Sequence, residues 1–184
     1  MWFVIGLVVI VVIVGLVVMV MYNRLVKLRN RCDSGWSAID VQLRRRYDLI
    51  PNLVETVKGY AKHEQGTLSA VIQARQAGID ANSVEAQGKA ENMLTGALNK
   101  LFALSEAYPD LKADANFRSL QEEITSTEDK VAYARQYYNA AVLAYRNALE
   151  TVPTNFVANS FGFKPRDYFE ISEPEARGPV QVSF

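Results

Sequence analysis

Histidine and cysteine are almost absent from the sequence. Among its 184 residues there is one histidine, His63, and one cysteine, Cys32. A zinc site needs three or four ligands drawn mainly from these two residue types, so the sequence predicts no metal site of this kind. A single thiol cannot form an internal disulfide, and Cys32 would need an activating partner to act as a nucleophile. We expect His63 on the surface and Cys32 buried on an apolar helical face.

The motifs of common enzyme classes are also missing. The sequence contains no glycine-rich phosphate loop, no G-x-S-x-G and no H-E-x-x-H. The carboxylates of "LQEEITSTEDK" lack the Glu-x-x-His motifs that helical di-iron sites require. We therefore predict no catalytic residue, no cofactor and no metal ion, and expect neither enzymatic activity nor a small-molecule substrate. Residues 47–184 hold 13 basic and 18 acidic residues, which argues against nucleic-acid binding.

Charged side chains are missing from the first 23 residues. From Trp2 to Met21 the sequence "WFVIGLVVIVVIVGLVVMVM" is entirely apolar or glycine. About 20 residues at about 1.5 Å rise span the roughly 30 Å hydrocarbon core of a bilayer. The alternative, a cleaved signal peptide, would need a basic start and a small-residue cleavage site. We predict a transmembrane anchor over residues 1–23, in which the lipid contacts include Trp2, Phe3, Leu7, Leu16 and Met21.

Basic residues follow the apolar segment directly. We expect these side chains, Arg24, Lys27, Arg29 and Arg31, to contact lipid head groups. By the positive-inside rule they place the body of the protein in the cytoplasm. The alternative of a periplasmic or extracellular body stays open, because the chain has almost no N-terminal flank for comparison.

The remaining pattern is helical. Apolar residues recur every three or four positions from residue 24 to 151, which predicts amphipathic helices over about 24–48, 51–77, 83–108 and 114–151. No proline interrupts residues 1–50, so the first helix should continue from the membrane anchor and end just before Pro51. Asp48 is expected to cap the second helix, Gly78 to stop it, and Asn82 or Ser83 to cap the third.

The predicted helix 114–151 has the most regular pattern. Its apolar seam keeps a strict three-four alternation and consists of Phe117, Leu120, Ile124, Thr127, Val131, Ala134, Tyr138, Ala141, Tyr145 and Ala148. Such a seam suits either an intermolecular coiled coil or the core face of an antiparallel bundle. Short loops join the four helices, which favours a bundle. The predicted fold class is therefore all-α: an N-terminal transmembrane helix continuous with a long antiparallel four-helix bundle.

Aromatic residues are concentrated after the last helix. The segment 152–170 includes Phe156, Phe161, Phe163, Tyr168 and Phe169, so we expect it to dock as an aromatic tail on its own bundle or on a neighbouring copy. Residues 171–184 are expected to be a flexible C-terminus.

Three consecutive arginines, Arg44 to Arg46, lie about 20 residues past the anchor. On a straight helix they would stand roughly 30 Å from the bilayer, beyond the Debye length of about 8 Å. We therefore expect contacts between helices or between protomers rather than with lipid. The residues predicted for such contacts are Arg44, Arg45, Arg46, Glu122, Glu123, Phe161, Phe163 and Phe169.

Three blocks of sequence closely resemble the bacterial LemA family. They are "YNRLVKLRNRCDSGWSAIDVQLRRRYDLIPNLVETVKGYAKHE", "NFRSLQEEITSTEDKVAYARQYYNAAVLAYRNALE" and "VPTNFVANSFGFKPRDYFE". The resemblance implies an N-terminal membrane helix, an antiparallel helical bundle and a single-pass protein of the bacterial inner membrane. It implies no established reaction, although some relatives are associated with membrane shaping or with stress-linked membrane operons.

Two hypotheses follow from these observations. The first is a structural membrane protein that assembles into a homo-oligomer and scaffolds or shapes the membrane. The alternative is an adaptor that binds another membrane protein, such as a protease or a sensor kinase. The first predicts a large uniform assembly and the second a stable monomer.

Overall fold

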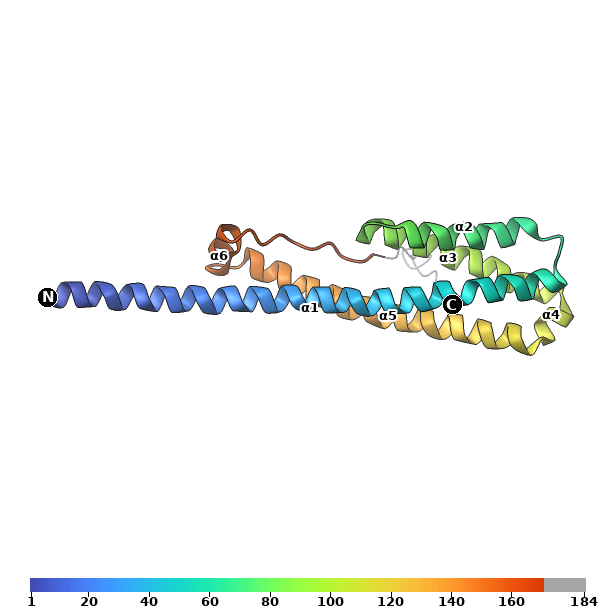
Figure 1. Ribbon diagram of the computed structural model, residues 1–184, viewed down its shortest axis with the longest axis horizontal. Helices are drawn as coiled ribbons and strands as arrows, with labels where there is room; N and C mark the ends of the chain where they lie inside the picture. Colours follow the sequence, from blue (N-terminus) through green and yellow to red (C-terminus); the bar gives the residue numbers. More distant parts are fainter. Residues whose placement is uncertain (171–184) are drawn as a thin grey trace, which may run out of the picture. The chain divides into compact units, whose positions relative to one another are not determined.

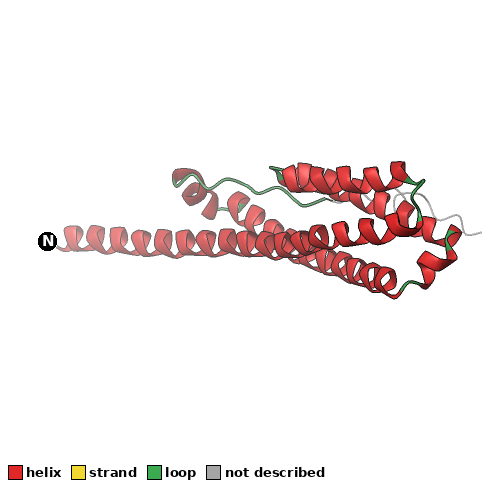
Figure 2. Ribbon diagram, turned by 45° about the vertical axis from the view of Figure 1, so that its right-hand side comes forward, coloured by secondary structure: helices red, strands yellow, loops and turns green. Residues whose placement is uncertain are grey.

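The computed structural model describes residues 1–170, and every regular element in this range is a helix (Figure 1, Figure 2). The all-α prediction is confirmed. The elements are α1 (Trp2–Tyr60), α2 (Gln65–Asp80), α3 (Val84–Leu104), the 3-10 turn η1 (Ser105–Ala107), α4 (Pro109–Ala113), α5 (Ala115–Glu150) and α6 (Thr154–Ser160). The C-terminus predicted to be flexible, 171–184, lies outside the described residues.

The chain divides into two compact units, and α1 and α5 contribute to both. The anchor unit comprises Met1–Ala38 and Ala134–Tyr168. The bundle unit comprises Ile39–Tyr133 together with Phe169 and Glu170 of the tail. Each unit has its own buried residues, and each is described by itself below.

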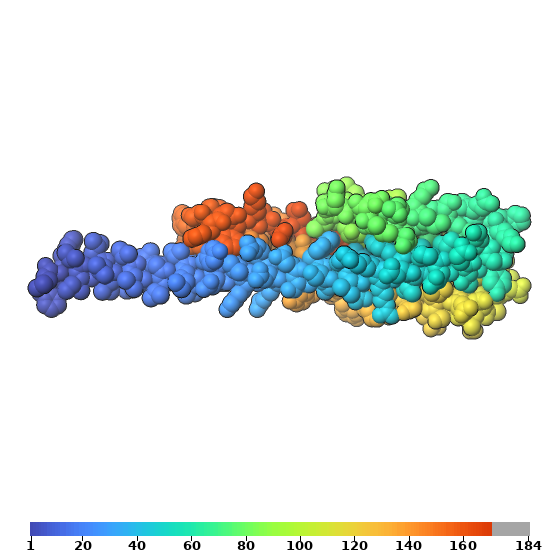
Figure 3. All heavy atoms as spheres, in the orientation of Figure 1, coloured from blue at the N-terminus to red at the C-terminus, as the bar shows by residue number. Residues whose placement is uncertain are grey.

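The N-terminal part of the anchor unit is an uncovered apolar helix. The mean hydropathy of α1 reaches 3.5 over 18 residues, and none of that window is buried within the protein. In Figure 3 the first turns of α1, drawn in dark blue, have no other segment over them on the visible face. A core helix of a water-soluble protein would be covered, so this segment has the length, composition and exposure of a membrane anchor.

Past the apolar segment, α1 packs against the C-terminal half of α5. The α1 side chains of Leu25 and Cys32 are at most 1 % exposed, and so is that of Tyr145 in α5. Gly35 allows a close approach here, because a Cβ at this position would lie only 3.1 Å from the Cα of Tyr138. Most seam residues of α5 are therefore buried within one chain, as the bundle interpretation predicts.

The bundle unit contains four long helical segments, which are residues 39–60 of α1, all of α2 and α3, and residues 115–133 of α5; the short η1 and α4 join α3 to α5. Its core includes Leu53, Val57, Leu94, Leu101 and Ile124, each at most 1 % exposed. The α1 and α5 segments are antiparallel, because Arg45 pairs with Glu123 whereas the later Tyr60 bonds to the earlier Asp114. These four segments form the predicted antiparallel bundle.

The predicted helix boundary at Pro51 is wrong. α1 continues through Pro51 to Tyr60, and the corner lies at residues 61–64. A proline inside a helix removes the hydrogen bond to the carbonyl four residues earlier, which here belongs to Tyr47. Arg75 of α2 donates its Nε–H to that carbonyl at 2.8 Å and supplies the missing partner.

Two further helix ends differ from the prediction. Asp48 lies inside α1 and starts no helix, and Gly78 lies inside α2 rather than ending it. Gly78 is needed for a packing reason, because a Cβ there would collide with the Tyr47 ring. The predicted cap of the third helix is confirmed at Ser83, whose Oγ accepts the Ala86 N–H at 3.1 Å.

Candidate functional site

A buried ion pair lies at the centre of the bundle unit. Nη1 of Arg46, in α1, donates to Oε2 of Glu91, in α3, at 3.0 Å. The Arg46 and Glu91 side chains are only 2 % and 1 % exposed. Removing two charges from water costs several kcal/mol each, so such a pair persists only when hydrogen bonds satisfy both partners.

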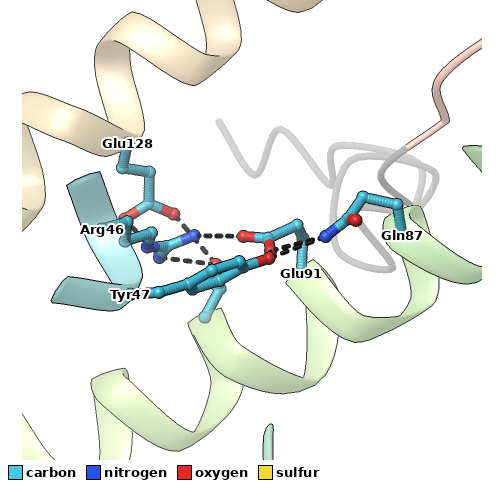
Figure 4. Close-up of polar contacts among 6 residues, drawn as sticks. Arg46, Tyr47, Gln87, Glu91 and Glu128 are labelled. Carbon is cyan, nitrogen blue, oxygen red and sulfur yellow. Dashed lines mark hydrogen bonds and ion pairs between the residues drawn. The ribbon is translucent and has the colours of Figure 1, made fainter. Parts of the chain in front are cut away.

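The Glu91 carboxylate receives further donors at its other oxygen. The Tyr47 hydroxyl donates to Oε1 of Glu91, and Gln87 Nε2 donates to the Tyr47 hydroxyl at 2.7 Å and to the same Glu91 oxygen at 3.3 Å. Figure 4 shows these side chains converging from α1 and α3. Burial, followed by the negative charge of Glu91, raises the pKa of Tyr47. Tyr47 therefore stays a neutral hydrogen-bond donor to Glu91.

The same arginine also reaches α5. Arg46 Nη2 donates to Thr95 Oγ1 at 3.0 Å and lies 3.4 Å from Oε2 of Glu128. Thr95 Oγ1 in turn donates to the second Glu128 oxygen at 3.2 Å. One guanidinium thus joins three helices of the bundle unit. Because its side chain is almost fully buried, this polar cluster can fix how the helices pack, but it offers no surface to a solute.

The three consecutive arginines have different surroundings. Arg44 pairs with Asp40, one turn earlier in its own helix, at 2.9 Å. The structure brings Arg45 together with Glu123 at 2.5 Å, while Glu122 is exposed. Arg46 is buried in its own chain and so cannot contact a second protomer.

The tail packs against its own chain in both units. Within the bundle unit Phe169 is 0 % exposed, and a Cβ on Gly88 of α3 would collide with the Glu170 carbonyl. Within the anchor unit Arg166 pairs with Asp33 at 2.7 Å, and the Tyr138 hydroxyl donates to the Asp167 carbonyl at 2.8 Å.

An aromatic group lies at the end of the apolar segment of α1. The ring of Tyr22 contacts the rings of Phe161 and Phe163 edge-on, with centroids 5.0 and 5.5 Å apart. The Arg29 guanidinium lies over the Phe163 ring at 5.5 Å. Of the residues predicted to contact head groups, Arg29 thus contributes a cation–π contact within the chain. Arg24, Lys27 and Arg31 are exposed, and their lipid contacts stay a prediction.

Comparison with known proteins places this architecture in a family. The pattern of the LemA family matches residues 35–184, which is most of the chain. The chain belongs to the LemA family. The family and the uncovered apolar helix together describe a membrane-associated protein.

The relatives of this chain include magnetosome proteins and a protein named LemA. Magnetosome protein MamQ 2 of Paramagnetospirillum magneticum is 25 % identical over 185 residues, covering 86 % of this chain and 68 % of the relative. Protein LemA of Metamycoplasma hominis is 29 % identical over 158 residues, covering 83 % of this chain and 70 % of the relative. Magnetosome protein MamQ of Magnetospirillum gryphiswaldense is 24 % identical over 185 residues, with coverages of 86 % and 68 %.

Sequence reasoning missed the α3 half of the polar cluster in this LemA-family chain. Glu91 and Gln87 continue the buried face of α3 one and two turns before Leu94, respectively. A glutamate on an otherwise apolar helical face is a signal that a buried cation lies opposite. That signal, combined with the unusual run of arginines, could have identified Arg46 as the partner.

Proposed function

We propose that this LemA-family protein is a membrane-anchored structural protein that assembles with copies of itself to scaffold or shape the bilayer. One observation carries the proposal. Within the anchor unit, α5 has an exposed outer face that carries four apolar side chains, Tyr137, Ala140, Leu143 and Ala144, together with the polar Gln136 and Asn147. The Tyr137 and Leu143 side chains are 55 % and 51 % exposed. This outer α5 face repeats at helical spacing and suits packing against another helix.

A second copy of the chain is the partner that fits the outer α5 face best. An anchor confines every copy to one membrane with one orientation, which raises the effective concentration of matching faces. The alanines at 140 and 144 leave room for a close approach between helices. Lateral contacts between identical bodies can close into rings or symmetric assemblies. The proposal gives the chain no catalytic role.

The proposed side of the membrane is the cytoplasm. Arg24, Lys27, Arg29 and Arg31 immediately follow the apolar segment, and residues 24–46 hold seven basic and two acidic groups. The positive-inside rule favours retention of such a flank in the cytoplasm.

The alternative function, an adaptor for another membrane protein, is supported by a different surface. In the bundle unit a shallow groove runs along α5 beside Glu122, Asp129 and Tyr133. Tyr133 is 73 % exposed there, and tyrosines at exposed grooves are frequent anchors of protein interfaces.

The deciding experiment measures the mass and shape of the full-length protein in mild detergent by single-particle imaging. We expect a uniform assembly of several copies. Leu143→Glu places a charge on the outer α5 face and is expected to reduce the assembly to smaller species. The matched control Ile72→Glu changes a side chain of similar exposure, 50 %, on α2, and should leave the assembly intact. A monomer at every concentration would contradict self-assembly and favour the adaptor.

A further inference from the structure

The short helix α6 leaves large apolar side chains exposed. α6 buries Thr154, Val157 and Ala158 against the rest of the anchor unit. On and beside it, Val152, Phe156 and Phe161 are 67 %, 66 % and 57 % exposed. We call these three residues the α6 patch. Side chains that face water are usually charged or polar. A contiguous group of exposed apolar side chains therefore marks an interaction site.

The contacts of Tyr22 place the α6 patch along α1. Tyr22 is the first residue after the apolar segment that ends at Met21. Its ring is 5.0 Å from that of Phe161, within the same unit. If the apolar segment fills the hydrocarbon core, Tyr22 stands where the head-group layer, roughly 5–7 Å thick, begins. Figure 1 shows α6 beside α1, beyond the end of α5.

We propose that the α6 patch is a second membrane contact, whose side chains insert into the head-group layer of the same bilayer that α1 spans. Tyrosines such as Tyr22 concentrate at this depth because their rings are amphipathic. The apolar side chains of interfacial helices, phenylalanine among them, insert at the boundary between head groups and acyl chains. A short segment with an exposed apolar face lies in the interface plane rather than crossing the bilayer. The patch is continuous with the anchor through the Tyr22–Phe161 contact, which is why lipid, rather than another protein, is the partner that fits.

The neighbouring charges agree with a lipid partner. Arg24 and Lys164 flank the aromatic contact and are exposed, so their cations can reach lipid phosphates. Arg29, seven residues past Tyr22 and thus about 10 Å further along α1, covers the Phe163 ring instead. The apolar patch and the nearest unpaired cations therefore occupy the first turns after the anchor, where head groups lie.

A second contact would change how α1 sits in the bilayer. A lone helix can rotate about its axis and tilt freely in the bilayer. Interfacial side chains on one side of the helix fix its rotation and its tilt angle. The α6 patch adds volume to one leaflet on one side of the anchor only. This inference rests on membrane anchoring and does not require self-assembly.

The test is a depth measurement on the full-length chain, reconstituted at one copy per nanodisc of phosphatidylcholine and phosphatidylglycerol. Spin labels are attached to Phe156→Cys or Val152→Cys in a Cys32→Ala background, which removes the native thiol. The control label is attached to Ser34→Cys, exposed in the same unit and about 18 Å past Tyr22 on α1. We expect oxygen to reach the patch labels more readily than a water-soluble nickel chelate does, and the reverse order at residue 34.

Two results would overturn the inference. Equal nickel accessibility at residues 156 and 34 would show that the patch faces water. The second result has two parts. The patch labels are exposed to water at one copy per disc, and they show dipolar broadening against each other in samples with several copies. This would show that a second chain covers the patch. Because the depth is measured on single copies, a failure of self-assembly leaves the result readable.

Discussion

The side chain of Arg75 completes the backbone hydrogen bonding of another helix. Its Nε–H donates to the carbonyl of Tyr47 at 2.8 Å, and Tyr47 is the residue four positions before Pro51. The bond that Pro51 cannot make is therefore made by α2 from outside. This contact explains why α1 continues through a proline that would otherwise end or kink it.

Replacement of Arg75 should be costly only while Pro51 is present. Arg75→Leu leaves the Tyr47 carbonyl without a donor, and we expect it to lower the free energy of unfolding by about 1–3 kcal/mol. In a Pro51→Ala background the residue at 51 regains its N–H and can bond to Tyr47, so the loss should shrink. Urea unfolding of all four proteins, followed by circular dichroism in detergent, measures this coupling. Equal losses in both backgrounds would show that the carbonyl is not what Arg75 serves.

Loss of Arg46 alone should destabilise the protein more than loss of Arg46 and Glu91 together. Arg46→Met alone leaves the Glu91 carboxylate buried without its cation, which should cost about 3–5 kcal/mol. Glu91→Met alone should cost less, because Arg46 keeps Glu128 at 3.4 Å. The double substitution removes both charges and should recover most of that loss. Lys89→Met breaks the exposed Lys89–Glu85 pair on the same helix and, as a control, should change stability by less than about 0.5 kcal/mol. A double variant no more stable than the single ones would argue against this account.

Two glycines of α3 should respond oppositely to alanine. At Gly88 a Cβ would collide with the Glu170 carbonyl and displace the buried Phe169, so Gly88→Ala should cost about 1–2 kcal/mol. At Gly96 nothing lies within 4 Å of the added Cβ, and Gly96→Ala should gain about 0.5–1 kcal/mol from helix propensity. Thermal unfolding of the two variants gives the comparison. A stabilising Gly88→Ala would mean that the tail does not rest on α3.

The free energy of unfolding should fall at high pH, and the ionisation of Tyr138 should contribute to this fall. Burial, and then the charge of the neighbouring Cys32 thiolate, raise the pKa of Tyr138 from its ordinary value of 10.0 to about 12. Between these values the unfolded chain releases the phenolic proton while the folded chain keeps it. Stability is therefore intact below pH 10 and falls as the pH rises from about 10 to about 12.

The Tyr138→Phe variant separates two effects of the hydroxyl. At pH 7 the variant loses the hydrogen bond to the Asp167 carbonyl, at a cost of about 1 kcal/mol. Between pH 10 and 12 its loss of stability should be shallower than that of the native protein by about 1.4 kcal/mol per pH unit. Urea unfolding at pH 7, 10, 11 and 12 measures both. Parallel pH profiles would show that Tyr138 does not carry the effect.

The features of the fold that were predictable depend on local periodicity. The apolar segment before Tyr22 and the seam of α5 are repeats readable within a few helical turns. The seam is buried as expected, with residues such as Phe117, Tyr138 and Tyr145 at most 3 % exposed. Ser83 was predictable as a cap for the same reason, since its bond to Ala86 spans three residues.

The features that escaped prediction depend on contacts between distant residues. Pro51 has a strong local preference for a helix start, and only Arg75, 24 positions later, overrides it. The partners of Arg46 lie 45 and 82 positions away, at Glu91 and Glu128, so the sequence could indicate an ion pair without naming them. Gly78 carried a local stop signal, but the Tyr47 ring packed against it decides its role.

The pairing of α1 with α5 also sets the order of events during synthesis. α1 leaves the ribosome first, yet Asp33 meets Arg166 only after 133 more residues have been added. At about 5–20 residues per second, this takes roughly 7–27 s. For most of that interval, until α5 is complete at Glu150, Leu25, Leu28 and Cys32 have no α5 to cover them. The newly made chain therefore needs the membrane, or a chaperone, to shield this face of α1 until its last long helix is complete.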